Sequence, residues 1–442
     1  MTHTWVGIAL AIVGLGIMVL VHEWGHFIVA RLFNVRVDVF SIGYGNRIFG
    51  WRRGDTDYRL SVFPFGGYVR MAGENPTEEL TGAPYEFLGK PRWQRFFIIL
   101  AGPTMNAVLA FALMWGLYVV GMPVAAYMQR PVEVAGVLPD SPAAKAGIQP
   151  GDKIVEINDT KIANWEQAGS DSLVIPGRDL TVHVERSGGI VPLKVAVPQN
   201  VSDLFSVLGY PKERVIVDQV DPNLPAAKAG LKHGDEIISA NGQTAVNFAA
   251  LQEMIQKSPG KPVDLVVRRD AKEIALTMLP INTDPGDGGG KRWVVGYTRI
   301  LDTVHESYPV LQAAQQSWTE NTSMVKQVLA VLTGLFTGRV SLKELAGPVG
   351  IVRMSSEAAK LGAAEFIFFM AFLSINLGIL NLLPIPILDG GHVLMLAIEG
   401  TLRRDLSLAV KERFVQVGLV FLLAVFGFVM YYDVVRLFQV HY

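Results

Sequence analysis

Two histidines and a glutamate near the amino terminus have the spacing of a hydrolytic metal site. His22, Glu23 and His26 belong to the sequence HEWGH. Residues four apart lie on one face of a helix, so both imidazoles can reach one metal ion. Glu23 can reach an attacking water without being a ligand. Gly25 leaves the helix surface open to a close neighbour. The pattern predicts a zinc hydrolase with Glu23 as the catalytic residue.

A catalytic zinc ion needs a third protein ligand, and the segment 381–392, NLLPIPILDGGH, offers two candidates. Pro384 and Pro386 are expected to break a helix, and the two glycines after Asp389 let the backbone turn. Asp389 is the preferred ligand because it lies close to this break and completes a set of two histidines and one carboxylate. His392 is the rival ligand.

The elements that must carry these residues are membrane spans. The chain has 442 residues, of which 50% are hydrophobic and 18% charged, against about 25% charged in ordinary soluble proteins. A helix needs about 20 apolar residues to cross a bilayer. Four stretches offer this length: 5–30, within 96–129, 366–388 and 414–432. HEWGH therefore lies at the inner end of the first span, where ionisable groups are costly unless they have a function.

The absence of cysteine and the net charge near zero exclude several other classes of protein. The chain contains no cysteine, which removes disulfides, iron–sulfur clusters and thiolate zinc sites. Any metal must be held by histidine, aspartate or glutamate. The net charge of −1 gives no overall basic field, so no nucleic-acid partner is expected.

Loop charges predict the orientation in the membrane. The loop 31–95 contains ten lysines and arginines, and the short link 400–413 contains four. The positive-inside rule places both loops in the cytoplasm. Both termini and the long segment 123–364 are then expected on the outer side.

The outer segment contains an internal repeat. PAAKAGIQPGDKIVEIN at 142–158 returns as PAAKAGLKHGDEIISAN at 225–241, 83 residues later. A period of this length indicates two small tandem domains rather than a solenoid. The pattern resembles bacterial PDZ domains, which bind extended peptides and often their terminal carboxylate. Leu208, Gly209 and Tyr210 before the second copy are predicted to form its carboxylate-binding loop. One or both domains could instead act as spacers or gates.

The two metal-site motifs together resemble one family. HExxH in the first span and NxxPxPxLDG in the third resemble the site-2 protease family of intramembrane zinc metalloproteases, in its Gram-negative form with two PDZ domains. The resemblance covers nearly the whole chain. It implies that His22, His26 and Asp389 hold one zinc ion per chain and that Glu23 is catalytic. It also implies that Asn381, whose amide both donates and accepts hydrogen bonds, handles the substrate.

The cytoplasmic loop extends this resemblance. Gly43, Tyr44 and Gly45 match a Gly-x-Gly motif whose middle residue is usually phenylalanine. Residues 57–71, DYRLSVFPFGGYVRM, indicate strands interrupted at Pro64 and at the pair Gly66 and Gly67. The family has a membrane-associated β-structure here, whose edge could clamp an unwound substrate. The alternative is a hairpin that only braces the fold. The residues expected to contact substrate are Asn381, Pro384, Pro386, Gly43, Tyr44, Gly45, Gly66 and Gly67.

The expected fold is a polytopic α-helical membrane protein with four transmembrane helices, a membrane-associated β-loop and two tandem periplasmic PDZ domains of mixed α/β structure. Residues 324–338 are expected to form an amphipathic helix at the outer leaflet, or else a buried core helix. The expected domains are a first span (1–30), cytoplasmic loop (31–95), second span (96–122), first PDZ domain (123–200), second PDZ domain (201–282), linker with amphipathic helices (283–364), third span (365–398), cytoplasmic link (399–413) and fourth span (414–442).

The resemblance implies an enzyme of the bacterial inner membrane. Its substrates would be single-span membrane proteins already trimmed on the periplasmic side, such as anti-sigma factors, and signal-peptide remnants. The second PDZ domain could read a peptide carboxyl terminus. Two alternatives are an inactive membrane PDZ scaffold and a transporter that uses histidine and aspartate as a proton relay. The scaffold leaves HEWGH and Asp389 unexplained, and the transporter gives no role to the PDZ pair.

Overall fold

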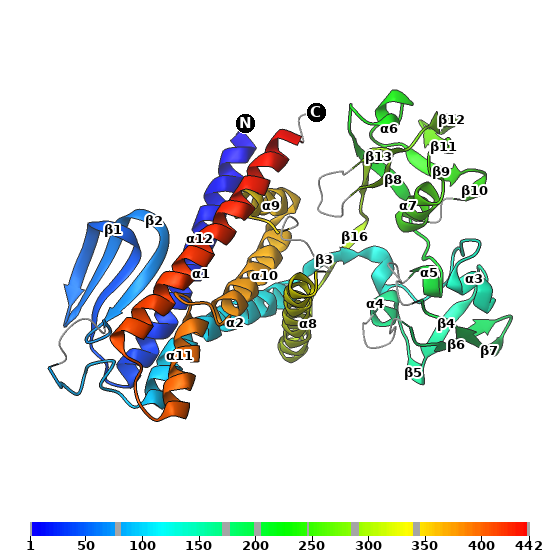
Figure 1. Cartoon of the computed structure of the whole chain (residues 1–442). Helices are drawn as coiled ribbons and strands as arrows, with labels where there is room; N and C mark the ends of the chain where they lie inside the picture. Colours follow the sequence, from blue (N-terminus) through cyan, green and yellow to red (C-terminus); the bar gives the residue numbers. More distant parts are fainter. Residues whose placement is uncertain are drawn as a thin grey trace. The chain divides into compact units, whose positions relative to one another are not determined.

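The chain divides into two compact units, a helical unit and a β-rich unit (Figure 1). The helical unit comprises residues 1–122 and 306–442, and the β-rich unit comprises residues 123–305. The computed structural model describes residues 2–75, 81–169, 177–198, 205–244, 247–283, 291–338 and 345–439.

Four helices of the described chain are long and apolar enough to cross a membrane, within Ala9–Leu32, Arg92–Val120, Ala363–Asn381 and Leu408–Val435. They correspond to the four expected spans. The third span ends earlier than expected, at Asn381 instead of Leu388, because Pro384 cannot continue a helix and restricts the residue before it. The helices of the unit are α1 (Thr2–Leu32), α2 (Arg92–Val120), α8 (Val310–Phe336), α9 (Pro348–Leu361), α10 (Ala363–Asn381), α11 (Asp389–Leu402) and α12 (Leu408–Gln439).

Helix α2 packs against α1, α8, α10 and α11. Glycines make two of these contacts close. A Cβ added to Gly25 of α1 would lie 2.4 Å from the carbonyl oxygen of Ala101, and one added to Gly378 of α10 would lie 3.1 Å from that of Pro103. Gly25 thus has the role expected from HEWGH. Small residues at helix contacts let backbones approach where no hydrophobic effect drives association.

The predicted strands of the cytoplasmic loop form an antiparallel pair, β1 (Val37–Arg53) and β2 (Thr56–Met71). Strand β2 bends, because both its start (Tyr58) and its end (Val69) pair with Phe40. Strand β1 bends as well, because both Ile42 and Phe49 pair with Leu60. The bend of β2 lies between Leu60 and Gly67, around the predicted interruption. The final segment 67–70 therefore forms an edge of the sheet.

The helix break before Asp389 is tightly built. Ile387 has φ +85°, which is rare for a β-branched residue and costs about 1–3 kcal/mol. Added Cβ atoms on Gly390 and Gly391 would lie 2.2 and 2.4 Å from the carbonyl oxygens of Leu383 and Ile385. The two glycines therefore let α11 begin directly against the loop that precedes it.

The predicted helix 324–338 is the second half of a longer helix, α8. Met324 and Val328 are buried, whereas Trp318 is exposed. The helix begins earlier than predicted, at Val310, because the polar residues of its first half do not form an apolar pattern. Pro309 stands at its amino-terminal cap position.

The β-rich unit contains two sheets, each with its own core. The first has the strand order β5-β4-β6-β7, and the second has β12-β11-β9-β8-β15 with β10 on β9. Two short pairs, β13-β14 and β16-β3, complete the unit. The strands are β3 (Met122–Ala125), β4 (Lys153–Ile157), β5 (Thr160–Lys161), β6 (Leu180–Arg186), β7 (Gly189–Val195), β8 (Val215–Val220), β9 (Glu236–Ala240), β10 (Gln243–Thr244), β11 (Val263–Arg269), β12 (Lys272–Met278), β13 (Ile281–Thr283), β14 (Arg292–Val294), β15 (Tyr297–Ile300) and β16 (Thr303–Glu306). The short helices are η1 (Ala126–Gln129), α3 (Pro142–Ala146), α4 (Trp165–Ala168), α5 (Phe205–Leu208), α6 (Pro225–Lys228) and α7 (Phe248–Gln256).

The sequence repeat reappears as a repeated ion pair. Arg186 donates two hydrogen bonds of 2.6 Å to the buried Asp152, and Arg269 makes the same two bonds to the buried Asp235. Burial raises the pKa of each aspartate, but the hydrogen bonds from its arginine and from a backbone N–H, together with the charge of the arginine, outweigh burial and hold the pKa below its ordinary value. The two halves thus share tertiary contacts as well as sequence.

The two repeated halves of the β-rich unit begin and end at other residues than the two PDZ domains expected from the sequence. Strand β15 lies beyond residue 282 yet pairs with β8, and Val295 is buried in the core of the second half. Val207 and Leu208, placed in the second domain by sequence, are buried in the core of the first half. The turn-rich segment 284–290 lies outside the described residues.

Candidate metal centre

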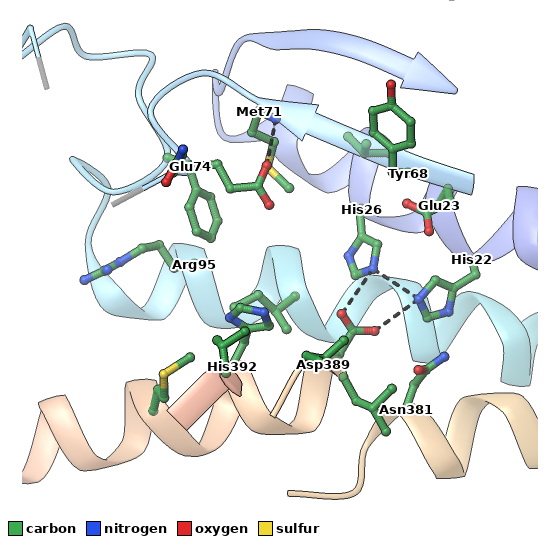
Figure 2. A pocket seen from close by; sticks show the side chains of 18 of the residues that line it. His22, Glu23, His26, Tyr68, Met71, Glu74, Arg95, Asn381, Asp389 and His392 are labelled. Atoms are coloured by element: carbon green, nitrogen blue, oxygen red, sulfur yellow. Dashed lines mark hydrogen bonds and ion pairs between the residues drawn. The ribbon is translucent and has the colours of Figure 1, made fainter. Parts of the chain in front are cut away.

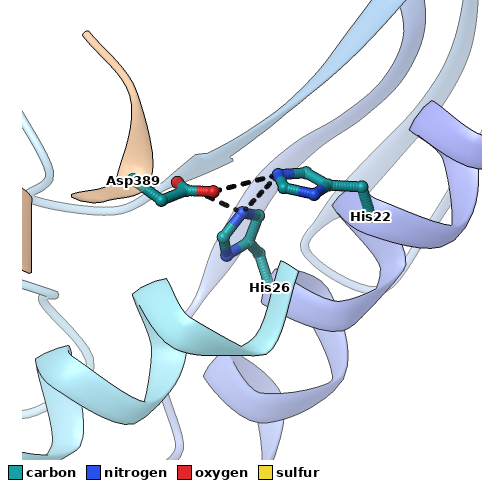
Figure 3. Close-up of side chains that lie close together, drawn as sticks. All are labelled: His22, His26 and Asp389. Carbon is teal, nitrogen blue, oxygen red and sulfur yellow. Dashed lines mark hydrogen bonds and ion pairs between the residues drawn. The ribbon is translucent and has the colours of Figure 1, made fainter. Parts of the chain in front are cut away.

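His22, His26 and Asp389 converge from the two ends of the chain (Figure 3). His22 Nε2 lies 3.1 Å from Asp389 Oδ2, and His26 Nε2 lies 3.5 Å from Asp389 Oδ1. The two Nε2 atoms are 3.3 Å apart. Both histidines are buried on one face of α1, and Asp389 opens α11 just after the helix break. The spacing in HEWGH and the break thus bring three metal-ligating side chains to one point.

This donor set fits zinc. Ligand atoms at 2.0–2.2 Å from a tetrahedral ion lie about 3.3 Å from each other. The two Nε2 atoms are 3.3 Å apart, and they lie 3.1 and 3.5 Å from the two different oxygens of Asp389, which is close to that value. Two imidazoles and one carboxylate leave the fourth position open, as catalytic zinc sites require. His392 lies outside this cluster of ligand atoms.

Helix α2 forms a wall behind the histidines that the sequence analysis missed. His26 Nδ1 donates to the carbonyl oxygen of Ile98 at 2.8 Å. A Cβ added to Gly102 would lie 2.3 Å from His26 Nε2 and 2.8 Å from His22 Nε2. Asn106 Nδ2 lies 3.1 Å from His22 Nδ1. A Gly-Pro pair and an asparagine in a charge-free span were the available signals.

Glu23 lies between α1 and the sheet (Figure 2). The backbone N–H of Val69 lies close to its carboxylate. A Cβ added to Gly67 would lie 3.2 Å from Glu23 Cγ, so this glycine lets β2 pass close to the glutamate. The ring of Tyr44 packs on Gly66 in the same region. Burial, together with the nearby Glu23 carboxylate, raises the pKa of Tyr44, which keeps its hydroxyl protonated.

A cavity of about 950 Å³ joins these groups. Its walls come from α1, β1, β2, α2, the end of α10, α11 and α12, and Figure 2 shows part of this lining. Asn381 and His392 line it together with the metal-site residues. Among the sequence-predicted site residues, the lining includes His22, Glu23, His26, Tyr44, Gly66, Gly67, Asn381 and Asp389.

The other predicted contact residues lie around this cavity rather than on its described walls. Gly43 and Gly45 have φ of +85° and +92°, which sets the backbone that presents Tyr44. Pro386 packs against α12, where a Cβ on Gly418 would lie 2.2 Å from its own Cβ. Pro384 is exposed in the loop. Both prolines shape the break before Asp389.

The predicted carboxylate-binding loop is not open to a ligand. Leu208 and Tyr210 are fully buried. The backbone N–H of Gly209 donates to Phe205, and that of Tyr210 donates to Gly136 at 2.8 Å. The Tyr210 hydroxyl bonds to Glu253. Two of the three amides of this loop, those of Gly209 and Tyr210, are thus already hydrogen-bonded within the chain, which argues against a carboxylate site here.

Replacing Gly102 by alanine is expected to weaken zinc binding and cleavage by about 10- to 100-fold, the range seen when groups that support metal ligands are disturbed. The new methyl group would overlap both Nε2 atoms. The hydrogen bond from His26 to Ile98 prevents the His26 ring from moving away. Gly116→Ala is the matched control, because a Cβ there meets nothing within 4 Å. Zinc content and cleavage by both variants would check this. Equal zinc binding by both would contradict it.

Comparisons with known proteins assign the chain to a family. A family model described as peptidase family M50 matches residues 10–425. The chain belongs to peptidase family M50. This M50 chain is 32% identical over 447 residues to the regulator of sigma-E protease RseP of Escherichia coli (strain K12), covering 96% of this chain and 98% of that protein. It is 31% identical over 459 residues to a putative zinc metalloprotease of Pasteurella multocida (strain Pm70), covering 99% of this chain and 100% of that protein.

Family M50 membership makes the chain a metalloprotease. The inactive scaffold and the proton-coupled transporter therefore lose their basis. One solved structure, a PDZ domain of the SdrC-like protein from Listeria monocytogenes, aligns with 21% of this chain and 90% of that chain at 22% identity, with a TM-score of 0.18.

Proposed function

We propose that this M50 metalloprotease hydrolyses peptide bonds within the transmembrane segments of single-span membrane proteins. The observation that supports this most is the meeting of His22, His26 and Asp389 in a cavity walled by apolar helices long enough to span a membrane. Glu23 lines the same cavity. This arrangement supports a hydrolytic site at the level where a membrane-spanning substrate would lie.

In the proposed mechanism, His22, His26 and Asp389 hold one zinc ion per chain. When bound, zinc acts as a Lewis acid that polarises the scissile carbonyl and acidifies water. Glu23 takes a proton from the attacking water and passes it to the leaving amine. The nearby N–H of Val69 is proposed to help orient the carboxylate for this role. The three side chains that would hold the ion line the cavity that would hold the substrate.

A substrate helix must unwind before it is cut, because its own hydrogen bonds shield each peptide bond. The edge segment 67–70 of β2 lies on the cavity wall, and an extended chain can add to such an edge as a further strand. The Asn381 amide lines the cavity and can bind the freed backbone groups of the substrate. These groups are proposed to hold the cleavage segment extended.

The proposed setting is a bacterial inner membrane, with both termini and residues 123–305 on the periplasmic side. The two repeated halves of the β-rich unit are proposed to be PDZ domains that restrict access to substrates already trimmed on that side. Anti-sigma factors and signal-peptide remnants are proposed substrates. The positive charges of the loop 31–95 support this orientation.

The test is cleavage by the purified full chain in detergent, with zinc measured in the same sample. The substrate is a single-span protein with a short outer tail, compared with the same span carrying a large folded outer domain. Cleavage of the short-tailed protein is expected, with loss on chelation and recovery on adding Zn²⁺. Cleavage that continues after all zinc has been removed would refute the mechanism. Equal cleavage of both substrates would refute the gating role.

A further inference from the structure

One face of α2 carries a stripe of three residues, each a helical turn from the next. Ile98, Gly102 and Asn106 are spaced by four, which places them on one side of the helix. The stripe meets the Nδ1 of His26 at its first residue, both Nε2 atoms at its second and the Nδ1 of His22 at its third. A single helix face therefore contacts both nitrogens of both histidines.

The orientation of the two imidazole rings decides which hydrogen-bond partner each Nδ1 atom requires. The Nε2 atoms face each other and Asp389, so ligation would use Nε2. A neutral imidazole that binds a metal through Nε2 carries its proton on Nδ1, and that proton needs an acceptor. His26 has one, because the Ile98 carbonyl oxygen can only accept. His22 needs an equivalent partner.

Asn106 occupies that place. Its amide lies 3.1 Å from His22 Nδ1 and its side chain is fully buried. An amide presents an oxygen on one side and an NH₂ group on the other, and rotation about its last bond exchanges the two. Turned so that the oxygen faces His22, the amide accepts the Nδ1 proton. The imidazole is then fixed in the tautomer that leaves Nε2 free for the metal.

We propose that Asn106 is a positioning residue for the metal ligand His22, the counterpart of the Ile98 carbonyl behind His26. This inference rests on the proposed zinc site. It assigns to α2, which contributes no residue to the ligand cluster, the control of both ligand tautomers.

The surroundings of Asn106 support a role beyond helix packing. Its backbone oxygen accepts a hydrogen bond of 2.8 Å from the buried Ser374 of α10. This bond joins the two helices without any use of the Asn106 side chain. The amide oxygen has no hydrogen-bond partner within the described residues, and an unpaired buried polar group is costly. A buried amide that serves only packing would be replaced at a gain by an apolar side chain of the same shape.

Zinc affinity of the full chain in detergent tests this, measured by competition with a chelator. Asn106→Leu keeps the volume and removes the acceptor, so its zinc dissociation constant is expected to rise about 10- to 100-fold. Asn106→Asp restores an acceptor and is expected to recover affinity close to that of the wild type. Thr104→Val is the matched control on α2, because Thr104 is exposed and bonds only to Leu100 of its own helix. It is expected to bind zinc as the wild type does.

Two results would overturn the inference. One is wild-type zinc affinity in Asn106→Leu, and the other is an equal loss in Asn106→Leu and Asn106→Asp, which would mean that packing and not acceptance matters. If Asn106→Leu does not fold, Asn106→Ala compared with Asn106→Asp gives the same test. Failure of the wild type itself to bind zinc would refute the proposed site instead, so the two failures are distinguishable.

Discussion

Replacement of Glu23 by glutamine is expected to lower the rate of peptide hydrolysis by about 10³-fold or more while zinc stays bound. A general base contributes about 10²–10⁴-fold to a rate, and here one group serves both as base and as acid. The glutamine amide keeps the length of the side chain and still presents an oxygen to the nearby Val69 N–H. It cannot take a proton from water. The fold and the three ligands are therefore expected to survive the change.

Glu74→Gln is the matched control for this experiment. Glu74 lines the same cavity and accepts a hydrogen bond from the backbone N–H of Met71 at 3.0 Å. Its loss removes one negative charge from the cavity without touching the ligand cluster, so a much smaller effect on cleavage is expected. Rates with one single-span substrate, and zinc per chain, would be measured for both variants. Retained cleavage in Glu23→Gln would remove Glu23 from the mechanism.

The sequence was sufficient for the residues whose chemistry and spacing are tied together. Two histidines four apart on a helix must share a face, and a proline-rich break followed by Asp-Gly-Gly must present its aspartate at a turn. The structure brings these groups within ligand distance of one another. The four long apolar helices followed from length and composition in the same way. Such inferences need no knowledge of how the helices pack.

Residues that act through packing could not be predicted from the sequence. Gly102 matters because two imidazoles lie where its Cβ would be, and Asn106 matters because His22 faces it. Both facts depend on which face of α2 meets α1. A lone asparagine in an apolar span signals some polar partner, but it does not name the partner. No residue of the second helix was therefore predicted to have a role in the site.

The Leu208–Tyr210 segment shows a different limit. A glycine between two apolar residues before a strand fits a carboxylate-binding loop, but it also fits a chain that passes between two cores. Leu208 is buried in the first core and Tyr210 in the second. The sequence pattern describes the backbone shape and leaves open whether its amides are free. Here the carbonyl groups of Phe205 and Gly136 accept them.

Replacement of Asp389 by alanine is expected to remove most of the bound zinc and, with it, all measurable cleavage. The carboxylate supplies the only ligand of the described cluster that does not come from α1. Structural zinc sites have four protein ligands and catalytic sites have three, so two imidazoles alone are too few for either. Loss of this carboxylate also leaves the two imidazoles without the anion that faces them at 3.1 and 3.5 Å. Zinc per chain, measured after dialysis against buffered low zinc, checks the expectation.

His392→Ala decides between the two ligands that the sequence offered. His392 follows Asp389 by one helical turn and lines the same cavity, but its ring lies outside the ligand cluster. Its replacement is therefore expected to leave zinc in place. If instead Asp389→Ala kept its full zinc and His392→Ala lost it, the third ligand would be the histidine. The turn at Ile387 would then have to place the start of α11 differently when zinc is bound. The strained φ of Ile387 and the packing of Pro386 on Gly418 argue against such a shift, because both hold the break in a single geometry.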